Sequence, residues 1–388
     1  MRHGIAVGLW MVAFGACQVA ALPQAHEALA GSQEAELFGP GTLTVMTRSL
    51  ELGAGLERAL EEAPSAAELP ARTAEALATL RQTDFIARAR GLADEIQYAR
   101  PHLIGLQEVS EVRVQSPGDA LFGGTQPAEE VAVDFLPLLL GELAARGLHY
   151  REVARVRNTD VEVPLLASAT PTFDDVRLTD YDVLLARADV EVSGSAAGNY
   201  QARREVRRSG AEPVVLLRGW TSVVARVGGR TYRFVNTHLE PAPDEARLRV
   251  QLAQAEELIS RLRGEPLPVV LMGNFNTPAN LGRVGAPTYR ELLLAGYVDV
   301  WTRRREPREW GPTCCEAAEG APRVPVLAQR QNLVLVRNSV MPLPRRIGPV
   351  LAWRVGGLLE EHQPEPWPTA LTGVAVRQRI PGAILPPH

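Results

Sequence analysis

The chain has few cysteines, no large net charge and no apolar run long enough to cross a bilayer. The formal net charge of −4 excludes a global attraction to nucleic acid or to an anionic bilayer, so an anionic ligand must meet a local cluster of side chains. No internal repeat or shift in composition divides the 388 residues, and 46% of them are hydrophobic. We therefore expect one large domain with a substantial core.

The scarcity of cysteine limits covalent chemistry. Apart from Cys17, the sequence holds the adjacent pair Cys314 and Cys315. In an exported protein this pair could form a strained vicinal disulfide or stay as two thiols. No histidine or further cysteine lies near the pair in sequence, which argues against a metal site there.

The N-terminus has the order of a secretory signal peptide. A basic start precedes an apolar run and then small residues, and the run is shorter than the roughly 20 residues that span a bilayer core. We expect cleavage after Ala21, a flexible leader over 22–40 and one domain over 41–388, with no transmembrane segment after removal of the signal. The protein would then be exported to the periplasm or the medium. A second interpretation makes Cys17 the lipid-carrying cysteine of a lipoprotein.

Apolar periodicity predicts interleaved helices and strands. Stripes with a period of 3.6 predict helices over 85–100, 131–146 and 244–263, and a short one from 289. Short apolar or alternating runs predict strands over 42–47, 103–109, 150–156, 182–186, 214–217, 221–227, 231–236, 269–272 and 332–338. Gly53 and Gly55 predict a loop after the first of these strands, and Gly228 and Gly229 mark a hairpin between two later ones. The pattern indicates two stacked sheets flanked by helices.

One predicted strand ends in amides at a place where enzymes often have acids. In PVVLMGNFNTP, residues 268–278, an apolar run is followed by Gly273, which lets the backbone turn at the strand's carboxyl edge. Asn274 and Asn276 can face one way from an extended segment. An amide can orient a phosphate or a water, but it cannot hold a negative charge for a metal or take up a proton at ordinary pH.

Polar residues follow apolar runs in six further segments. With the first, the set is MTRSLELGAG at 46–55, GLQEV at 105–109, DYDVLLAR at 180–187, FVNTHLE at 234–240, GNFN at 273–276, RQNLVLVRN at 330–338 and PWPTALTGVAV at 366–376. Their order and spacing resemble the endonuclease/exonuclease/phosphatase superfamily of metal-dependent phosphoesterases, which includes nucleases, sphingomyelinases and inositol-phosphate phosphatases. The chain is most similar to exported bacterial members, from about Thr42 to Val376.

The resemblance implies an α/β (α+β) fold, a four-layer αββα sandwich of two stacked mixed sheets flanked by helices, with these segments at one rim. It also implies site residues. Glu108 matches a glutamate that holds Mg²⁺, and His238 matches a histidine that contacts the scissile phosphate. Asn276 matches a retained catalytic asparagine, although an asparagine at this place can equally cap a turn. Asp182 could contact the substrate at the rim or be only a strand-end charge.

Other positions depart from the family's pattern. Asn274 stands where the family has an aspartate, which leaves it a vestigial catalytic position, and Ser49 replaces an asparagine but could still contact the substrate. Asn332 replaces a late aspartate. A serine–aspartate–histidine triplet falls on Thr369, Ala370 and Leu371. In the family that histidine is essential to in-line attack on phosphorus, and leucine cannot replace it.

These replacements bear on the chemistry that the site can perform. Hydrolysis of a phosphodiester needs a hard cation on carboxylate oxygens, a group that activates water and donors for the developing charge. With three acidic positions replaced, Glu108 is the one acid left among the family's acidic positions, and a lone carboxylate is a poor Mg²⁺ site unless phosphate completes it. Binding of Mg²⁺, or of Mn²⁺, should be weak or absent. Restoring Asn274→Asp alone should not revive activity.

The sequence thus favours an exported family member that binds a phosphate-bearing ligand or a partner and whose hydrolysis is lost or severely impaired. One alternative is an active Mg²⁺-dependent phosphodiesterase or phosphatase, nuclease- or sphingomyelinase-like, with a rearranged site. His362, close to the triplet in sequence, could have taken over the role of the lost histidine. Another is a structural envelope protein. The ligand could be a small phosphorylated molecule, a lipid headgroup or nucleic acid. The basic segments 203–208 and 301–310 are expected to be solvated loops, although either could meet a phosphate.

Overall fold

The computed structural model describes residues 42–50, 54–63, 65–81, 84–167, 172–207, 213–281, 285–303, 313–316, 327–337 and 372–379. The chain divides into the units Met1–Gly39 and Pro40–His388, and every described residue belongs to the second. Several expectations fall outside the described residues: the signal peptide and leader, Cys17, His362 and the triplet 369–371. Among the described residues, no helix combines the length and apolar character that crossing a bilayer requires.

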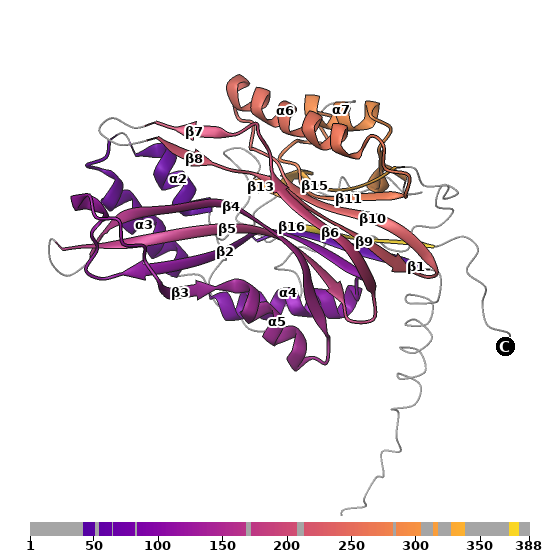
Figure 1. The fold of residues 1–388 in the computed structure, drawn as a ribbon, viewed down its shortest axis with the longest axis horizontal. Helices are drawn as coiled ribbons and strands as arrows, with labels where there is room; N and C mark the ends of the chain where they lie inside the picture. The colour runs from indigo at the N-terminus through magenta and orange to yellow at the C-terminus, as the bar shows by residue number, and fades with distance from the viewer. Residues whose placement is uncertain are drawn as a thin grey trace, which may run out of the picture. The chain divides into compact units, whose positions relative to one another are not determined.

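Two six-stranded mixed sheets form the centre of the domain (Figure 1). In the first sheet the strand order is β16-β1-β2-β5-β4, and β3 pairs with β2 outside this path. β1 and β2 run parallel, and the other pairs are antiparallel. The strands are β1 (Thr42–Ser49), β2 (Leu103–Gln115), β3 (Glu130–Asp134), β4 (Tyr150–Leu166), β5 (Phe173–Arg187) and β16 (Thr372–Arg379).

The second sheet has the order β12-β15-β11-β10-β9-β6, with β10 and β11 parallel and the other pairs antiparallel. Its strands are β6 (Glu191–Asn199), β9 (Gly219–Val227), β10 (Arg230–His238), β11 (Val269–Asn274), β12 (Val298–Asp299) and β15 (Asn332–Arg337). Two short pairs stand apart: β7 (Arg204–Val206) with β8 (Val214–Leu216), and β13 (Cys314–Glu316) with β14 (Leu327–Gln329). Gly228 and Gly229, with φ of 56° and 77°, form the predicted turn between β9 and β10.

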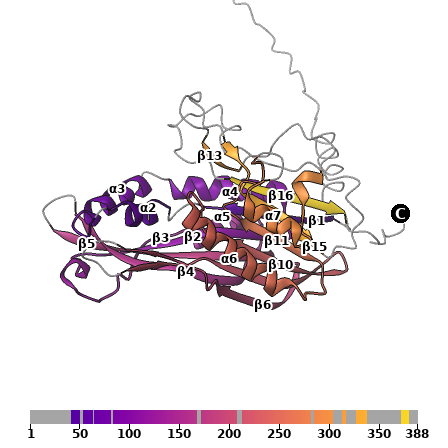
Figure 2. The same cartoon turned by 90° about the horizontal axis from the view of Figure 1, so that it is seen from above.

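Four of the α-helices cover the outer faces of the two sheets. The α-helices are α2 (Ala54–Glu62), α3 (Leu69–Arg81), α4 (Phe85–Ala99), α5 (Phe135–Ala145), α6 (Glu245–Leu262) and α7 (Pro287–Leu294), and short 3-10 turns are η1 (Ala120–Phe122) and η2 (Val300–Arg303). α4 and α5 share an apolar cluster with the first sheet, and α6 and α7 share one with the second. Figure 2 shows α6 and α7 lying across β10 and β11.

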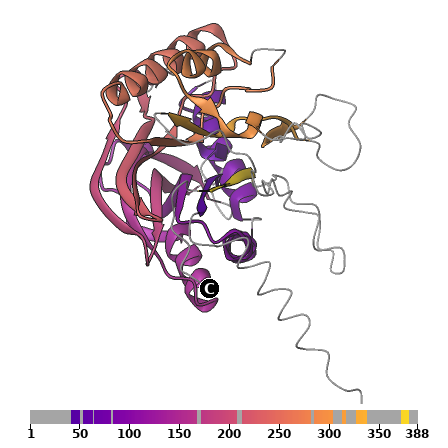
Figure 3. The ribbon, with the colours of Figure 1, turned by 90° about the vertical axis from the view of Figure 1, so that its right-hand side faces the viewer.

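The faces between the sheets form the central core. Leu184 and Leu103 of the first sheet pack with Phe234, Val270 and Met272 of the second in one buried cluster. The layers therefore follow the order helices, sheet, sheet, helices, which Figure 3 shows from the side, with the orange helices and the purple helices on opposite faces. The expected four-layer sandwich is confirmed.

A buried amide joins the two sheets. Asn236 on β10 donates from Nδ2 to the carbonyl oxygens of Leu106 and Val183 on the first sheet, at 3.0 and 3.2 Å. Gln107 donates from Nε2 to Asn236 Oδ1 at 2.5 Å. Gly105 allows this approach, because a Cβ at that position would lie 2.7 Å from Asn236 Oδ1. The contact fixes the sheets relative to each other, because each of these buried polar groups loses its partner if the sheets slide.

The structure corrects three local predictions. Residues 130–134 form β3 and not the start of a helix, because Val133 pairs with Val112 on β2; Pro137 then lies in the first turn of α5, where its missing N–H costs nothing. The solvated loop expected at 203–208 contains β7, and Arg204 forms ion pairs with Glu240 and Glu61. The loop expected at Gly55 lies inside α2.

Candidate functional site

The predicted site residues lie around His238 at the seam between the sheets. On the first sheet, Ser49 Oγ donates to Glu108 Oε1 at 3.1 Å, and Glu108 Oε1 lies 3.7 Å from His238 Nε2. His238 Nδ1 lies 3.9 Å from Asp182 Oδ1. On the second sheet, Asn276 Nδ2 lies 3.1 Å from His238 Nε2. The first sheet thus contributes the acids, and the second contributes the imidazole and the amides.

Glu108 occupies an unusual backbone position. Its φ is 56°, and the ladder between β2 and β5 shifts register between Leu106 and Val109. A bulge of this kind turns one side chain out of the regular alternation of the strand. For a residue other than glycine, the left-handed conformation costs about 1 kcal/mol or more, so the surrounding sheet must hold it.

The hydrogen bonds of Asn276 settle the proton position on His238. Asn276 Nδ2 also donates to the Leu239 carbonyl oxygen at 2.7 Å, which fixes the orientation of the amide, since a flipped amide would point oxygen at oxygen. The same NH₂ group therefore donates to His238 Nε2. The neutral ring then carries its proton on Nδ1, facing Asp182.

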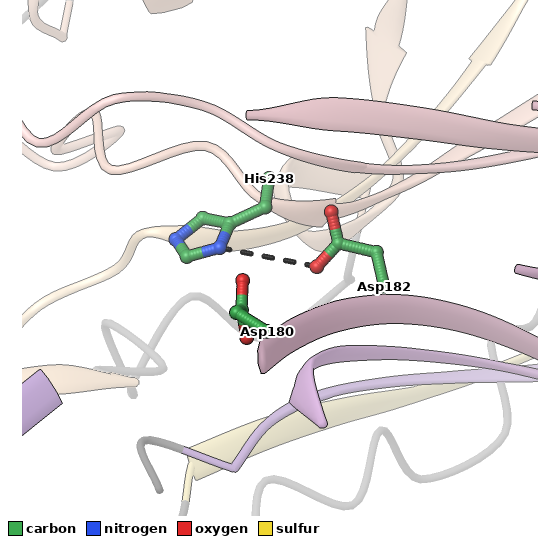
Figure 4. Close-up of side chains that lie close together, drawn as sticks. All are labelled: Asp180, Asp182 and His238. Atoms are coloured by element: carbon green, nitrogen blue, oxygen red, sulfur yellow. Dashed lines mark ion pairs between the residues drawn. The ribbon is translucent and has the colours of Figure 1, made fainter. Parts of the chain in front are cut away.

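Asp180 is a site residue that the sequence analysis missed. It lies on β5 two residues before Asp182, so both carboxylates leave the same face of the strand. One ligand atom each of Asp180, Asp182 and His238 lie within 4.8 Å of one another, and all three residues are buried. Figure 4 shows the two carboxylates pointing toward the imidazole ring.

A signal in the sequence could have found Asp180. The residues of β5 that share its face are Val176, Leu178, Asp180, Asp182 and Leu184. Val176 and Leu178 pack against α2 and α3, while Leu184 belongs to the core between the sheets. Two acids within an otherwise apolar stripe lie where the second sheet ends and the α2–α3 pair begins. Buried carboxylates at such a junction indicate a site.

The burial of this cluster shifts its protonation. Burial raises the pKa of Asp182 to about 7. Burial, followed by the charge of Asp182, raises the pKa of Asp180 well above its usual range. Burial and then the charge of Arg218 lower the pKa of His238 well below its usual range, so the ring is neutral at pH 7.

Several polar atoms of the cluster lack hydrogen-bond partners. Both carboxylate oxygens of Asp182, Oδ1 of Asp180 and Nδ1 of His238 are buried without one. Buried polar groups normally have partners, so these atoms call for protons or for a bound cation. The two carboxylates offer hard oxygen ligands, which suit Mg²⁺ and Mn²⁺, while the proton on Nδ1 and the amide at Nε2 leave His238 no lone pair for a metal. Glu108 lies close enough to His238 to take part.

The second sheet presents amides at the same rim. Asn274 on β11 and Asn332 on β15 are register partners on antiparallel strands, and both are buried. The Asn276 backbone N–H donates to Asn274 Oδ1 at 3.1 Å, and Asn276 has a φ of 48°, a conformation that asparagine tolerates. Gly273 lets β11 approach β10, because a Cβ there would lie 2.0 Å from the Thr237 carbonyl oxygen. This edge can orient a ligand but offers no charge.

The triplet 369–371, which departs from the expected serine–aspartate–histidine pattern, lies outside the described residues. β16 begins directly after Leu371, and its first residue, Thr372, is the register partner of Ser49. Thr369 and Ala370 are likewise outside the described residues. None of the three side chains can act as a general base.

Comparison with known proteins gives one family and a shared fold. The model of the Endonuclease/Exonuclease/phosphatase family matches residues 81–324, more than half of the chain, and no curated protein matches the sequence significantly. A structure of an endonuclease/exonuclease/phosphatase from Beutenbergia cavernae is similar, with 18% identity, a TM-score of 0.50, and coverage of 88% of this chain and 72% of that one.

Other solved structures are similar at lower scores. A family protein from Leptotrichia buccalis has 12% identity and a TM-score of 0.48, over 86% of this chain and 98% of that one. A mannosyl-6-phosphatase from Bacteroides thetaiotaomicron has 16% identity and a TM-score of 0.46, over 86% and 98%. At these identities the likeness is one of fold.

Proposed function

Because the chain belongs to the endonuclease/exonuclease/phosphatase family, we propose that it binds a phosphate-bearing ligand while its metal-dependent hydrolysis is lost or severely impaired. The observation that carries the proposal is the buried register pair Asn274 and Asn332. Two amides there can donate hydrogen bonds to phosphate oxygens, but they supply neither a proton acceptor nor a negative charge for a cation. The substitutions at Ala370 and Leu371 point the same way.

The acidic side of the site fits a cation. Asp180 and Asp182 would hold it, since buried oxygens of both lack partners, and Glu108, whose Oε1 lies 3.7 Å from His238 Nε2, is the further carboxylate at the site. A divalent cation, when bound, supplies charge that neutralises phosphate oxygens. His238, with its proton on Nδ1, would donate to Asp182, and Asn276 would keep the ring in place through Nε2. These residues bind and orient; none is free to accept the proton of an attacking water.

An activity assay tests the loss of hydrolysis. The purified protein would be incubated with Mg²⁺ or Mn²⁺ and bis-p-nitrophenyl phosphate, plasmid DNA or sphingomyelin. We expect no more turnover in the wild type than in Glu108→Ala, since loss of a general base costs roughly a hundred- to ten-thousand-fold in rate. Titration of the wild type with Mn²⁺ and then phosphate should show binding heat that Asp182→Asn removes. Turnover in the wild type that Glu108→Ala abolishes would contradict the proposal.

The second candidate is an active phosphodiesterase with a rearranged site. The cluster of Asp180, Asp182 and His238 favours it, because the family's acidic positions at 274 and 332 are lost while this acidic side is intact. Under this alternative, turnover with Mg²⁺ or Mn²⁺ would disappear in Asp182→Asn. The same assay therefore separates the two functions.

Export is part of the proposal. The apolar N-terminal run and its small residues support cleavage after Ala21. N-terminal sequencing of the protein from its native cells should begin at Leu22. A lipid-blocked N-terminus at Cys17 would instead make it a lipoprotein, and an intact Met1 would exclude export by this route.

A further inference from the structure

A second group of carboxylates lies where the loop after β2 meets the β4–β5 hairpin. Asp119 precedes η1, Glu162 lies on β4 and Asp175 lies on β5; one carboxylate oxygen of each lies within 4.8 Å of the others. β4 and β5 run side by side in Figure 1. Asp175 precedes Asp180 by five residues on the same strand, about 17 Å at the usual rise, so this group is separate from the His238 site.

Asp175 is buried and only partly satisfied. Its side chain is 1% exposed, and its Oδ2 accepts hydrogen bonds from the backbone N–H groups of Asp119 and Ala120 at 2.6 and 2.9 Å. Its Oδ1 is buried without a hydrogen-bond partner, and so is Oδ1 of Asp119. A buried carboxylate oxygen without a donor loses its hydration and gains nothing in return. A partner of positive charge would remove that penalty.

The side chains of the described residues do not supply that charge. Among the described residues, no arginine, lysine or histidine forms an ion pair with any of the three acids, and the neighbouring Arg177 pairs with Asp160 at 2.7 Å. Burial, followed by the charge of Asp175, raises the pKa of Glu162. Three acids within a few ångströms repel one another unless a cation lies among them.

We propose that Asp119, Glu162 and Asp175 bind a Ca²⁺ ion. The donors are hard oxygens, and no nitrogen or sulfur ligand joins them among the described residues, which argues against Zn²⁺. Ca²⁺ accepts irregular sets of six to eight oxygen ligands, whereas Mg²⁺ demands a near-ideal octahedron. The three acids come from two strands and a loop, an irregular arrangement. The ion would tie the loop after β2 to the hairpin and stabilise the domain.

Backbone donors already hold the carboxylates in place. Glu162 Oε2 accepts from the Ala128 N–H at 3.0 Å, and Asp119 Oδ2 accepts from the Gln126 N–H at 3.3 Å. An amide oxygen can accept the same bonds. Glu162→Gln and Asp119→Asn should therefore keep the loop folded while removing the negative charge that attracts the ion.

Calorimetry and thermal melting of the full chain, first freed of metals with EDTA, test the site. We expect wild-type protein to bind Ca²⁺ and to melt at a higher temperature with it, with a smaller effect of Mg²⁺. Glu162→Gln and Asp119→Asn should each weaken Ca²⁺ binding by more than about tenfold. Asp174→Asn is the matched control: it removes the adjacent acid on the other face of β5 and should leave Ca²⁺ affinity unchanged.

A Glu108→Gln variant separates this site from the one at His238. Ca²⁺ binding that persists in Glu108→Gln and is lost in Glu162→Gln supports the proposal. No Ca²⁺ bound to the wild type overturns it, and so does binding that vanishes in Glu108→Gln but survives in Glu162→Gln. If either substituted protein fails to fold, the number of Ca²⁺ ions bound by Glu108→Gln decides: one or more supports the site, and none overturns it.

Discussion

At the scale of single residues, Asp182 links the state of the site to pH. It is buried, close to Asp180 and His238, and its two oxygens lack hydrogen-bond donors. An acid in this position prefers to be neutral, so folding and ionisation oppose each other. Glu108 shows a second conflict, because its carboxylate depends on a backbone conformation that glycine would adopt with less strain.

The pKa of Asp182 predicts how stability changes with pH. Below pH 4 the group is protonated in the folded and unfolded chains, and its contribution to folding is fully present. As pH rises through the folded pKa of about 7, the folded chain must ionise a buried acid and stability falls. Urea unfolding in EDTA at pH 5 and pH 8 should show a loss in the wild type that is smaller by roughly 1–4 kcal/mol in Asp182→Asn.

Metal and a neighbouring acid provide the controls for this experiment. Mn²⁺ at pH 8 should restore stability to the wild type and not to Asp182→Asn, because cations bind the ionised carboxylate. Asp174→Asn removes an acid from the far end of the same strand, and its unfolding free energy should change with pH as that of the wild type does. If the unfolding free energy of the wild type and of Asp182→Asn changed equally between pH 5 and pH 8, the raised pKa of Asp182 would be contradicted.

At the scale of elements, ion pairs fasten α2 to the second sheet. Arg218 Nη2 lies 2.8 Å from Glu57 Oε2 on α2, and Arg218 Nε lies 3.4 Å from Glu240 Oε2. Arg218 and Glu240 are buried, at 3% and 0% exposure. Glu61 of α2 contacts Arg204 and Arg247. These charges lie next to the acids of β5, so the position of α2 shapes the electrostatics of the site.

Removing Arg218 should be costly. Arg218→Met leaves Glu57 and Glu240 short of a partner in a buried place, and we expect a loss of about 3–5 kcal/mol in unfolding free energy by urea titration. Arg249→Met is the matched control, since its pair with Glu245 on α6 is exposed and should contribute nothing measurable. A second change, Glu57→Gln, should recover part of the loss; similar effects of both arginine variants would exclude a special role for Arg218.

At the scale of the whole molecule, the contact at Gly105 sets the distance between the sheets. Gly105→Ala would push a methyl group to within 2.7 Å of Asn236 Oδ1, which breaks the bridge or separates the layers. We expect a loss of about 1–3 kcal/mol by urea unfolding. Gly91→Ala is the control: its Cβ meets nothing within 4 Å on α4, and helix propensity predicts a gain of roughly 0.5–1 kcal/mol. If Gly105→Ala left the unfolding free energy unchanged, the contact between the sheets at Asn236 would be loosely packed.

The sequence predicts the parts of this fold whose local pattern is strong. The stripe over 244–263 predicts α6, which the structure confirms at Glu245–Leu262. α2 and α3 escape prediction because they cover only the end of the β4–β5 hairpin, so few of their positions need to be apolar. β4 extends to Leu166, beyond the predicted 150–156.

The residues of the site are likewise predicted by the sequence only in part. Glu108, His238 and Asn276 are marked by motifs, and the structure brings them together. Asp180 needs the face of β5, which is visible only when the partners of its apolar neighbours are known. The acids at 119, 162 and 175 meet because of the register of the hairpin, where Asp175 pairs with Pro164, and no local pattern encodes that register.

Because the site is divided between the two sheets, a bound ligand would stabilise the contact between them. A cation bound by Asp182 and Glu108 on the first sheet could also bind a phosphate that Asn276 contacts on the second sheet. The bound pair would then connect the two sheets. Its binding energy would then appear as cohesion between the sheets. Amide hydrogens along β5 and β10, including those at positions away from the binding residues, should exchange more slowly when the ligand is bound. Hydrogen exchange would then detect a ligand that is bound but not converted to a product.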